Sequence, residues 1–272
     1  MKLVVVTSTG AGVEQITEAY EANAAFWVKI ARQRLDRYQT DLTDPALWQM
    51  IGDPTDLDIL DAGSGEGYLT RELSARGARH VYAVDVCEPL TAAAQSHPDA
   101  APDRQSYLTA DVAALPLADD SVDLIVANRI PHPLSDPARR FDEYARVLRP
   151  SGRLVLLSLH PCFYTARAER TAATPMSPGE YFGARTVVQH FNVAGITSPA
   201  PSVQRFYSLS DYLTMLTAAG FVITAVQEPH PTAEQYADPW WQENFRRPLF
   251  LLIEARPRHD GPKAPLGDTR NR

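Results

Sequence analysis

Cysteine and long hydrophobic runs are scarce in this sequence, and each scarcity excludes a class of protein. The 272 residues include 2 cysteines, Cys87 and Cys162, and neither lies in a Cys-x-x-Cys motif or a Cys/His cluster. This excludes a disulfide framework and a zinc site of the usual ligand spacing. The first apolar run, residues 3–6, is far shorter than the roughly 18 residues that cross a bilayer and shorter than the core of a signal peptide. We therefore expect a soluble, cytoplasmic protein without a membrane partner.

Positive charge is also scarce. The chain has 26 Lys and Arg residues against 33 Asp and Glu residues, which gives a formal net charge of −7 at pH 7. Proteins that bind phosphate backbones or anionic membranes carry a basic excess, so the charge balance argues against nucleic acid as a partner. The chain is 44% hydrophobic and 22% charged, a globular composition that allows one large α/β domain or two small ones.

Short apolar runs alternate with helical patterns along the middle of the chain. The runs are residues 58–62, 80–85, 105–111, 122–128, 153–159, 221–228 and 249–255. The first five are nearly continuous and are separated by helical patterns, as are parallel strands buried on both faces. This order predicts an α/β fold with a doubly wound, Rossmann-like sheet of seven strands. We expect the last strand to be antiparallel, because residues 229–248 offer no clear crossover helix.

The same patterns divide the chain into segments. From Glu14 to Tyr38, apolar residues recur at three- and four-residue steps, which predicts an amphipathic helix. A stretch of about 50 residues interrupts the sheet after the fifth strand, too long for an ordinary connection, and we expect it to form a lid over a substrate. The predicted segments are a flexible or swapped arm (1–13), an N-terminal helical cap (14–52), a ligand-binding core (53–159), the lid (160–209), the end of the core sheet (210–256) and a disordered tail (257–272).

The strongest chemical signal is a glycine loop, Asp61-Ala62-Gly63-Ser64-Gly65-Glu66-Gly67, at the end of the first predicted strand. Glycines at alternate positions let the backbone approach a ligand closely, and the N-terminus of the following helix offers free N–H groups. The G-x-G-x-G spacing differs from the G-x-G-x-x-G of dinucleotide-binding loops, which disfavours a nicotinamide-dependent oxidoreductase. Asp61 suits an ammonium group better than a pyrophosphate. We infer a ligand that carries both an ammonium and a carboxylate.

Two further aspartates end the next two predicted strands. Asp85 is at the tip of the second strand, where a carboxylate accepts hydrogen bonds from a ribose diol. Asp111 follows the third strand and is placed to accept from an exocyclic amine such as that of adenine. Each aspartate alone is explained equally well as a helix cap or turn former. The ordered set of three acids with the glycine loop therefore carries the prediction of a nucleoside ligand.

These residues resemble the class I S-adenosylmethionine-dependent methyltransferases. The resemblance covers residues 56–160 well and 210–255 adequately, and it includes Leu115-Pro116-Leu117-Ala118-Asp119-Asp120-Ser121 and Glu143-x-x-Arg146-Val147-Leu148-Arg149-Pro150-x-Gly152. It implies a methyltransferase sheet, with S-adenosylmethionine as cofactor and S-adenosylhomocysteine as product. The cofactor-binding residues that it implies are Asp61, Ala62, Gly63, Ser64, Gly65, Gly67, Asp85, Val86, Asp111, Val112 and Asn128.

Methyl transfer from a sulfonium is a displacement that needs no metal, so we expect the protein mainly to orient its ligands and exclude water. A base assists if the acceptor is a hydroxyl or an ammonium group. His132 and His160 follow the fourth and fifth predicted strands, whose ends face the ligand crevice of such a sheet. They are the catalytic candidates, and the alternative is that each only hydrogen-bonds loop backbone.

The predicted lid is rich in aromatic residues, and residues 186–193 and 202–207 have the content of a β-hairpin. We expect a small, largely apolar or aromatic acceptor, and the resemblance to methyltransferases of secondary metabolism, including antibiotic biosynthesis, implies a natural product. Oxygen, nitrogen and carbon acceptors all stay open, including a prenyl or indole carbon whose cation Glu180 would stabilise. The predicted substrate residues are Tyr20, Trp27, Phe163, Glu180, Tyr181, Phe182, Phe191 and Phe206.

Two further expectations concern activity and assembly. A protein of this fold that binds the cofactor without turnover, acting in regulation or assembly, is the alternative to an enzyme. Residues 1–13 carry an apolar run without an evident local partner. This motivates a homo-oligomer in which the arm, or the helix that begins at Glu14, reaches a neighbouring subunit.

Overall fold

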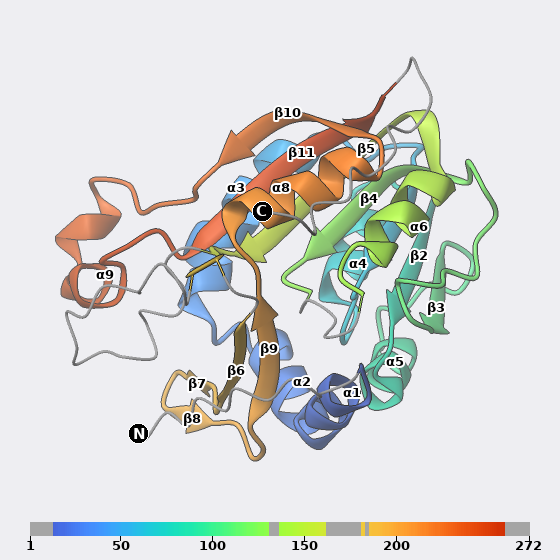
Figure 1. Cartoon of the computed structure of the whole chain (residues 1–272). Helices are drawn as coiled ribbons and strands as arrows, with labels where there is room; N and C mark the ends of the chain where they lie inside the picture. The colour runs from blue at the N-terminus through green and yellow to red at the C-terminus, as the bar shows by residue number, and fades with distance from the viewer. Residues whose placement is uncertain (1–12, 131–135, 162–180, 183–184, 259–272) are drawn as a thin grey trace.

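The computed structural model describes residues 13–130, 136–161, 181–182 and 185–258. A seven-stranded sheet with the strand order β10-β11-β5-β4-β1-β2-β3 forms its centre (Figure 1). The strands are β1 (Asp58–Ala62), β2 (His80–Asp85), β3 (Gln105–Thr109), β4 (Val122–Asn128), β5 (Leu148–Leu159), β10 (Phe221–Gln227) and β11 (Phe250–Pro257). Strands β1 to β5 pair in parallel, whereas β11 is antiparallel to both β5 and β10. The predicted α/β sheet with an antiparallel last strand is confirmed.

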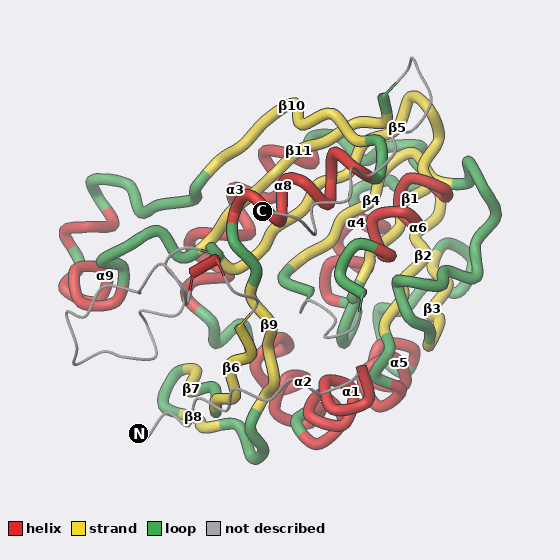
Figure 2. The backbone as a smooth tube through the Cα atoms, viewed as in Figure 1, coloured by secondary structure: helices red, strands yellow, loops and turns green. Residues whose placement is uncertain are grey.

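Helices cover both faces of the sheet (Figure 2). The α-helices are α1 (Val13–Ala22), α2 (Ala24–Arg32), α3 (Asp44–Ile51), α4 (Tyr68–Ala75), α5 (Glu88–Gln95), α6 (Arg139–Val147), α8 (Leu209–Ala218) and α9 (Pro239–Asn244). Between β3 and β4 the chain forms turns rather than a helix, which leaves the segment around residue 111 in a loop. In the described ranges, no helix has the length and hydrophobicity that crossing a membrane requires.

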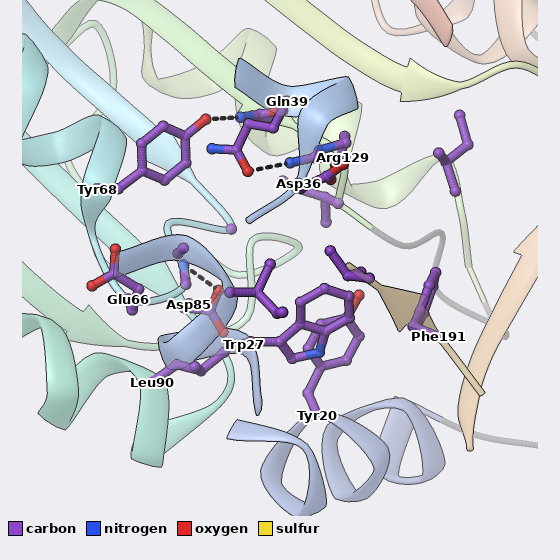
Figure 3. A pocket seen from close by; sticks show the side chains of 18 of the residues that line it. Tyr20, Trp27, Asp36, Gln39, Glu66, Tyr68, Asp85, Leu90, Arg129 and Phe191 are labelled. Atoms are coloured by element: carbon purple, nitrogen blue, oxygen red, sulfur yellow. Dashed lines mark hydrogen bonds and ion pairs between the residues drawn. The ribbon is translucent and has the colours of Figure 1, made fainter. Parts of the chain in front are cut away.

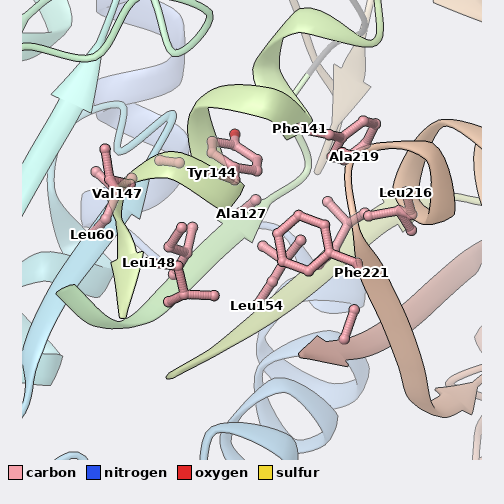
Figure 4. Packing of buried hydrophobic residues seen from close by; sticks show 14 of the residues in the cluster. Leu60, Ala127, Phe141, Tyr144, Val147, Leu148, Leu154, Leu216, Ala219 and Phe221 are labelled. Carbon is pink, nitrogen blue, oxygen red and sulfur yellow. The ribbon is translucent and has the colours of Figure 1, made fainter. Parts of the chain in front are cut away.

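One face of the sheet is covered by α6 and α8 (Figure 4). Phe141 and Tyr144 of α6 and Leu216 of α8 pack with Leu60 and Ile125 of the central strands. All five side chains are fully buried, and burial of each apolar side chain contributes about 1.5–3 kcal/mol to the hydrophobic driving force. This packing holds β1 and β4 in place beside the functional residues that follow them.

The opposite face is covered by α3, α4 and α9. Leu47 of α3, Leu73 of α4 and Trp241 of α9 pack with Ile59 and Val126. Because successive residues of a strand point to opposite faces, neighbours such as residues 59 and 60 belong to different cores. Burial on both faces therefore explains why the central strands read as continuous apolar runs.

The N-terminal cap differs from the prediction of one helix between Glu14 and Tyr38. The helix breaks at Asn23, which separates α1 from α2. The Asn23 side chain is fully buried, and its Nδ2 donates to the carbonyl oxygens of Ala19 (2.8 Å) and Ala200 (3.0 Å). The prediction of a continuous helix was wrong because a tertiary contact with residue 200, distant in the sequence, sets the break.

The described part of the predicted lid contains the expected hairpin. Strand β6 (Arg185–Gln189) pairs antiparallel with β9 (Ser202–Phe206), and the short strands β7 (Asn192–Val193) and β8 (Ile196–Thr197) pair beyond it. Val187 and Phe206 of this lid hairpin pack against Leu159 at the end of β5, and β9 contacts α1. Figure 1 shows β6 and β9 running from the sheet toward α1 and α2. The hairpin therefore bridges the core and the N-terminal cap.

Candidate active site

A cavity of about 900 Å³ lies at the carboxyl ends of β1, β2, β4 and β5 (Figure 3). The glycine loop and the residues that follow these strands form one side of it. The N-terminal cap and the lid hairpin form the other side. Its volume is within the range of about 300–1,000 Å³ that is common for ligand pockets.

The glycine loop takes a conformation that favours glycine. Gly63, Gly65 and Gly67 have φ values of +69°, +56° and +79°. The Gly63 N–H donates to the carbonyl oxygen of Val84 (2.7 Å), which anchors the loop on β2. A Cβ at Gly65 would meet nothing within 4 Å, and Gly65 lines the cavity. The backbone at this position is therefore open to close approach by a ligand.

Asp85 joins the glycine loop to the end of β2. Its Oδ2 accepts from the Gly65 N–H and its Oδ1 from the Cys87 N–H, both at 2.8 Å. Burial raises the pKa of Asp85, and these backbone N–H groups oppose the shift. The carboxylate is thus fixed at the cavity wall, and each oxygen keeps a lone pair for a ligand hydroxyl.

Asp61 is the most deeply buried acid of the cavity wall. The residue is 1% exposed, and its Oδ2 accepts from the Thr70 hydroxyl at 2.6 Å. Burial raises the pKa of the Asp61 carboxyl to about 7, and repulsion from Asp85 adds to the shift. A cationic ligand beside this carboxyl would favour its ionised form. The buried Asp61 carboxyl is therefore consistent with the ligand ammonium group that the sequence predicts beside it.

The side chain of Asn128 has its orientation fixed by neighbours. Tyr68 donates its hydroxyl to Asp44 Oδ1 (3.2 Å) and accepts from Asn128 Nδ2 (2.7 Å). Asn128 Oδ1 is buried and has no hydrogen-bond partner within the described residues, and Asn128 lines the cavity. An unpaired buried acceptor costs about 1–3 kcal/mol, so the arrangement suits a ligand that donates a hydrogen bond.

Arg129 connects the end of β4 to the N-terminal cap. Its guanidinium pairs with Asp36 (2.9 Å). It also donates to Gln39 Oε1 (2.8 Å), a bond that Figure 3 shows. Its φ of +56° is rare for a residue with a side chain and marks a strained position of the kind that occurs at functional sites. All three residues line the cavity. Sequence reasoning missed them because the ion pair joins segments about 90 residues apart.

Most of the predicted cofactor residues come together in this cavity. Those that line it are Asp61, Gly63, Ser64, Gly65, Asp85, Val86, Asp111, Val112 and Asn128. Ala62 and Gly67 are outside the lining set. Ala62 is fully buried in the core, and Gly67 is the N-cap residue of α4, where a Cβ would lie 2.9 Å from Tyr107 Cε1.

Three of the predicted substrate residues form an aromatic wall. Tyr20, Trp27 and Phe191 line the cavity, with ring centroids 6.3 Å apart for Tyr20 and Trp27 and 5.1 Å apart for Trp27 and Phe191 (Figure 3). The Trp27 Nε1–H is buried and has no hydrogen-bond partner among the described residues. The wall thus combines flat apolar faces with the hydrogen-bonding groups of Tyr20 and Trp27.

The other predicted substrate residues are located elsewhere or are not described. Phe206 packs in the lid hairpin, the Tyr181 hydroxyl accepts from the Leu209 N–H (3.1 Å), and Phe182 is 66% exposed. None of these three lines the cavity. Phe163 and Glu180 lie outside the described residues.

Of the two predicted catalytic histidines, the structure describes one, and it lies outside the cavity lining. His132 lies outside the described residues, as does most of the predicted arm and tail. His160 is 3% exposed and does not line the cavity, and its Nε2 is 2.9 Å from Glu228 Oε1. Burial lowers the pKa of His160, and Glu228 opposes the shift. A third histidine, His190 of the lid hairpin, does line the cavity, and sequence reasoning missed it.

The sheet with its antiparallel last strand and the acid-bearing glycine loop define a class I methyltransferase architecture. A family described as methyltransferase domain matches residues 60–156. A crystallised S-adenosylmethionine-dependent methyltransferase from Mesorhizobium loti is 30% identical, with a TM-score of 0.62, and the match covers 78% of this chain and 96% of that chain. The chain therefore belongs to the S-adenosylmethionine-dependent methyltransferases.

Curated relatives share the central part of the chain. A malonyl-[acyl-carrier protein] O-methyltransferase from Pseudescherichia vulneris is 31% identical over 159 residues, which are 58% of this chain and 56% of that protein. A demethylmenaquinone methyltransferase from Clavibacter sepedonicus is 36% identical over 98 residues, 36% of this chain and 39% of that protein. This chain covers between 21% and 56% of the length of these and other curated relatives.

Proposed function

We propose that this enzyme transfers the methyl group of S-adenosylmethionine to a small, flat, largely apolar acceptor held between the N-terminal cap and the lid hairpin. The observation that carries the proposal is the aromatic wall of Tyr20, Trp27 and Phe191, which faces the same cavity as the glycine loop. One cavity therefore has a surface for the methyl donor and a separate apolar surface for an acceptor.

We propose the following placement of the donor. Asp61 and Asn128 Oδ1 receive the ammonium end, because one is a buried carboxyl and the other a buried acceptor without a partner. Asp85 binds the ribose hydroxyls, and Asp111 with Val112 binds the adenine. When bound, S-adenosylmethionine supplies an electrophilic methyl group on a positively charged sulfur. The protein then orients the acceptor and excludes water.

The acceptor atom is the finer part of the proposal. The two relatives named above act, by their names, on a malonyl-[acyl-carrier protein] and on demethylmenaquinone, so membership of the family is compatible with several acceptors. The described lid residues that line the cavity are amides, one imidazole and apolar or small residues, with no carboxylate among them. A prenyl or indole carbon acceptor forms a cation that a carboxylate would stabilise. This composition favours an oxygen or nitrogen acceptor.

Calorimetry with S-adenosylmethionine, followed by a turnover assay, tests the proposal. We expect binding by the wild type and release of S-adenosylhomocysteine with members of a panel of hydroxy- and amino-substituted aromatic compounds. Phe191→Ala should raise the KM for the acceptor, while the same truncation at the 66% exposed Phe182 should not. Cofactor binding without turnover on any panel compound would support the non-catalytic alternative, and an unchanged KM in Phe191→Ala would move the acceptor away from the aromatic wall.

A further inference from the structure

The structure brings one imidazole into the described wall of the cavity, on the acceptor side. His190 follows β6 and lines the cavity together with its neighbours Gln189 and Phe191. Phe191 packs its ring against Trp27 of the cap. His190 is therefore part of the surface to which the proposed function assigns the acceptor.

The hydrogen bonding of His190 fixes which ring nitrogen carries the proton in the neutral form. Nδ1 is 2.8 Å from the carbonyl oxygen of Ser198. A carbonyl oxygen only accepts, so Nδ1 must donate and Nε2 then holds a lone pair. Within the described residues, Nε2 has no hydrogen-bond partner. The ring is thus held in the form that can take up a proton at Nε2.

A buried polar network holds the Ser198 carbonyl in position. Ser198 is 2% exposed; its Oγ accepts from the Phe191 N–H (3.0 Å) and donates to the Ala200 carbonyl (3.0 Å). Asn23, which is fully buried, bonds both the N–H (2.9 Å) and the carbonyl (3.0 Å) of Ala200. The orientation of the imidazole is therefore fixed by the N-terminal cap as well as by the lid hairpin, as a positioned base requires.

The carboxylates of the cavity wall are less suited to this task. They are Asp36, Asp61, Glu66, Asp85 and Asp111, and each accepts at least one hydrogen bond from the protein. Asp36 and Glu66 are also paired with arginines. The other ionisable side chains of the described wall are Tyr20, Arg37, Tyr38, Tyr68, Arg129 and Arg140, which are cations or hydrogen-bond donors at neutral pH. Of the ionisable groups in the described wall, the His190 imidazole is therefore the best suited to act as a base on the acceptor side.

We propose that His190 is a catalytic base and that the acceptor is a hydroxyl or ammonium compound that loses a proton on methylation. This rests on the proposed function. The lone pair left on the acceptor oxygen or nitrogen forms the bond to the methyl carbon. The carbon–sulfur bond breaks with its electron pair on sulfur, and the acceptor proton moves to Nε2. The imidazolium then returns the proton to water.

NMR of the whole protein tests the proposal without an acceptor. Long-range proton–nitrogen spectra of protein labelled with ¹⁵N-histidine are recorded at pH 8 with S-adenosylhomocysteine, and the His190 signals are assigned by their loss in His190→Asn. We expect a protonated Nδ1 and an unprotonated Nε2. A proton on Nε2 in the neutral ring would overturn the proposal whether or not a panel compound is methylated.

Turnover on a panel compound gives the second readout. In His190→Asn the side-chain amide can still donate to Ser198, so the lid should stay in place while the base is lost. We expect kcat to fall by about 10²- to 10⁴-fold, with the affinity for S-adenosylhomocysteine and the melting temperature unchanged.

Matched histidine variants complete the design. His230 is exposed, outside the described cavity wall, and has its Nδ1 3.0 Å from the backbone carbonyl of Glu228, so His230→Asn controls for the loss of an imidazole that has a similar bond. Its kcat should equal that of the wild type. Full kcat in His190→Asn, or a comparable fall in kcat in His132→Asn or His160→Asn instead, would overturn the assignment.

Discussion

The buried carboxyl of Asp61 should make the ligand-free enzyme less stable as the pH rises. Its pKa in the folded protein is about 7, whereas an unfolded aspartate has a pKa of about 3.9. Between these two values the folded state binds a proton that the unfolded state has released. The contribution to stability is therefore full below about pH 4 and is lost as the pH approaches 7. Asp61→Asn removes this titration and keeps an oxygen to accept from Thr70.

The size of the effect follows from the pKa. At pH 5 the wild type lies about two pH units below the folded pKa of about 7, and each unit corresponds to about 1.4 kcal/mol. From pH 5 to pH 8 the wild type should therefore lose about 2–3 kcal/mol of unfolding free energy relative to Asp61→Asn. Asp58 is a matched control, because its bond from Arg79 lowers its pKa. Asp58→Asn should leave the dependence between pH 5 and 8 unchanged.

Urea unfolding of the ligand-free proteins across this pH range measures the change in stability. Calorimetry measures the proton that Asp61 releases when S-adenosylmethionine binds. Asp61 is about half protonated at pH 7. Binding of the ammonium group should therefore release about half a proton at this pH, detected as a dependence of the binding enthalpy on the ionisation enthalpy of the buffer. Parallel pH profiles for the wild type and Asp61→Asn, with no proton release, would refute the reasoning.

Four further substitutions test the donor half of the site. Asp85→Ala should weaken S-adenosylmethionine binding by about 10- to 100-fold, because hydrogen bonds to a charged group contribute about 1.5–3 kcal/mol each; calorimetry measures the affinity. Gly63→Ala places a Cβ 2.5 Å from a neighbouring side chain at positive φ and should lower the melting temperature strongly. At Gly65 a Cβ would meet nothing within 4 Å. Gly65→Ala should therefore keep a melting temperature near that of the wild type but bind S-adenosylmethionine more weakly. Tyr68→Phe leaves Asn128 Nδ2 without its partner and should cost about 1–3 kcal/mol in urea unfolding; wild-type stability in this variant would contradict the fixed amide.

The donor half of the site could be predicted from the sequence because its residues are set by local structure. The glycine loop begins in the last two residues of β1, and Asp85 and Asn128 are the last residues of β2 and β4. Parallel strands bring their carboxyl ends to one edge of the sheet, so residues distant in the sequence meet without any special contact. Asp111 is in a loop after β3 for the same reason.

The acceptor half could not be predicted in this way because its residues are positioned by contacts between distant segments. Nothing in the local sequence of residues 185–206 indicates that His190 lines the cavity while Phe206 packs against Val187 and Leu159. The strand period assigns both to a hairpin, but only the docking of the hairpin on Leu159 decides which side is the wall. His160, in contrast, follows a strand as expected and still turns to Glu228.

The N-terminal cap makes the two halves of the site depend on each other. Asp36 of the cap pairs with Arg129 beside the donor surface, and Asn23 holds Ala200 of the lid hairpin, which in turn fixes the carbonyl bonded to His190. Each of these contacts is buried or partly buried, so breaking one leaves polar groups without partners. The N-terminal cap contacts both surfaces. A substitution at Asn23 should therefore disturb the acceptor side first, while loss of Asp36 should disturb Arg129 on the donor side. The cap therefore sets the alignment of donor and acceptor on which an in-line displacement depends.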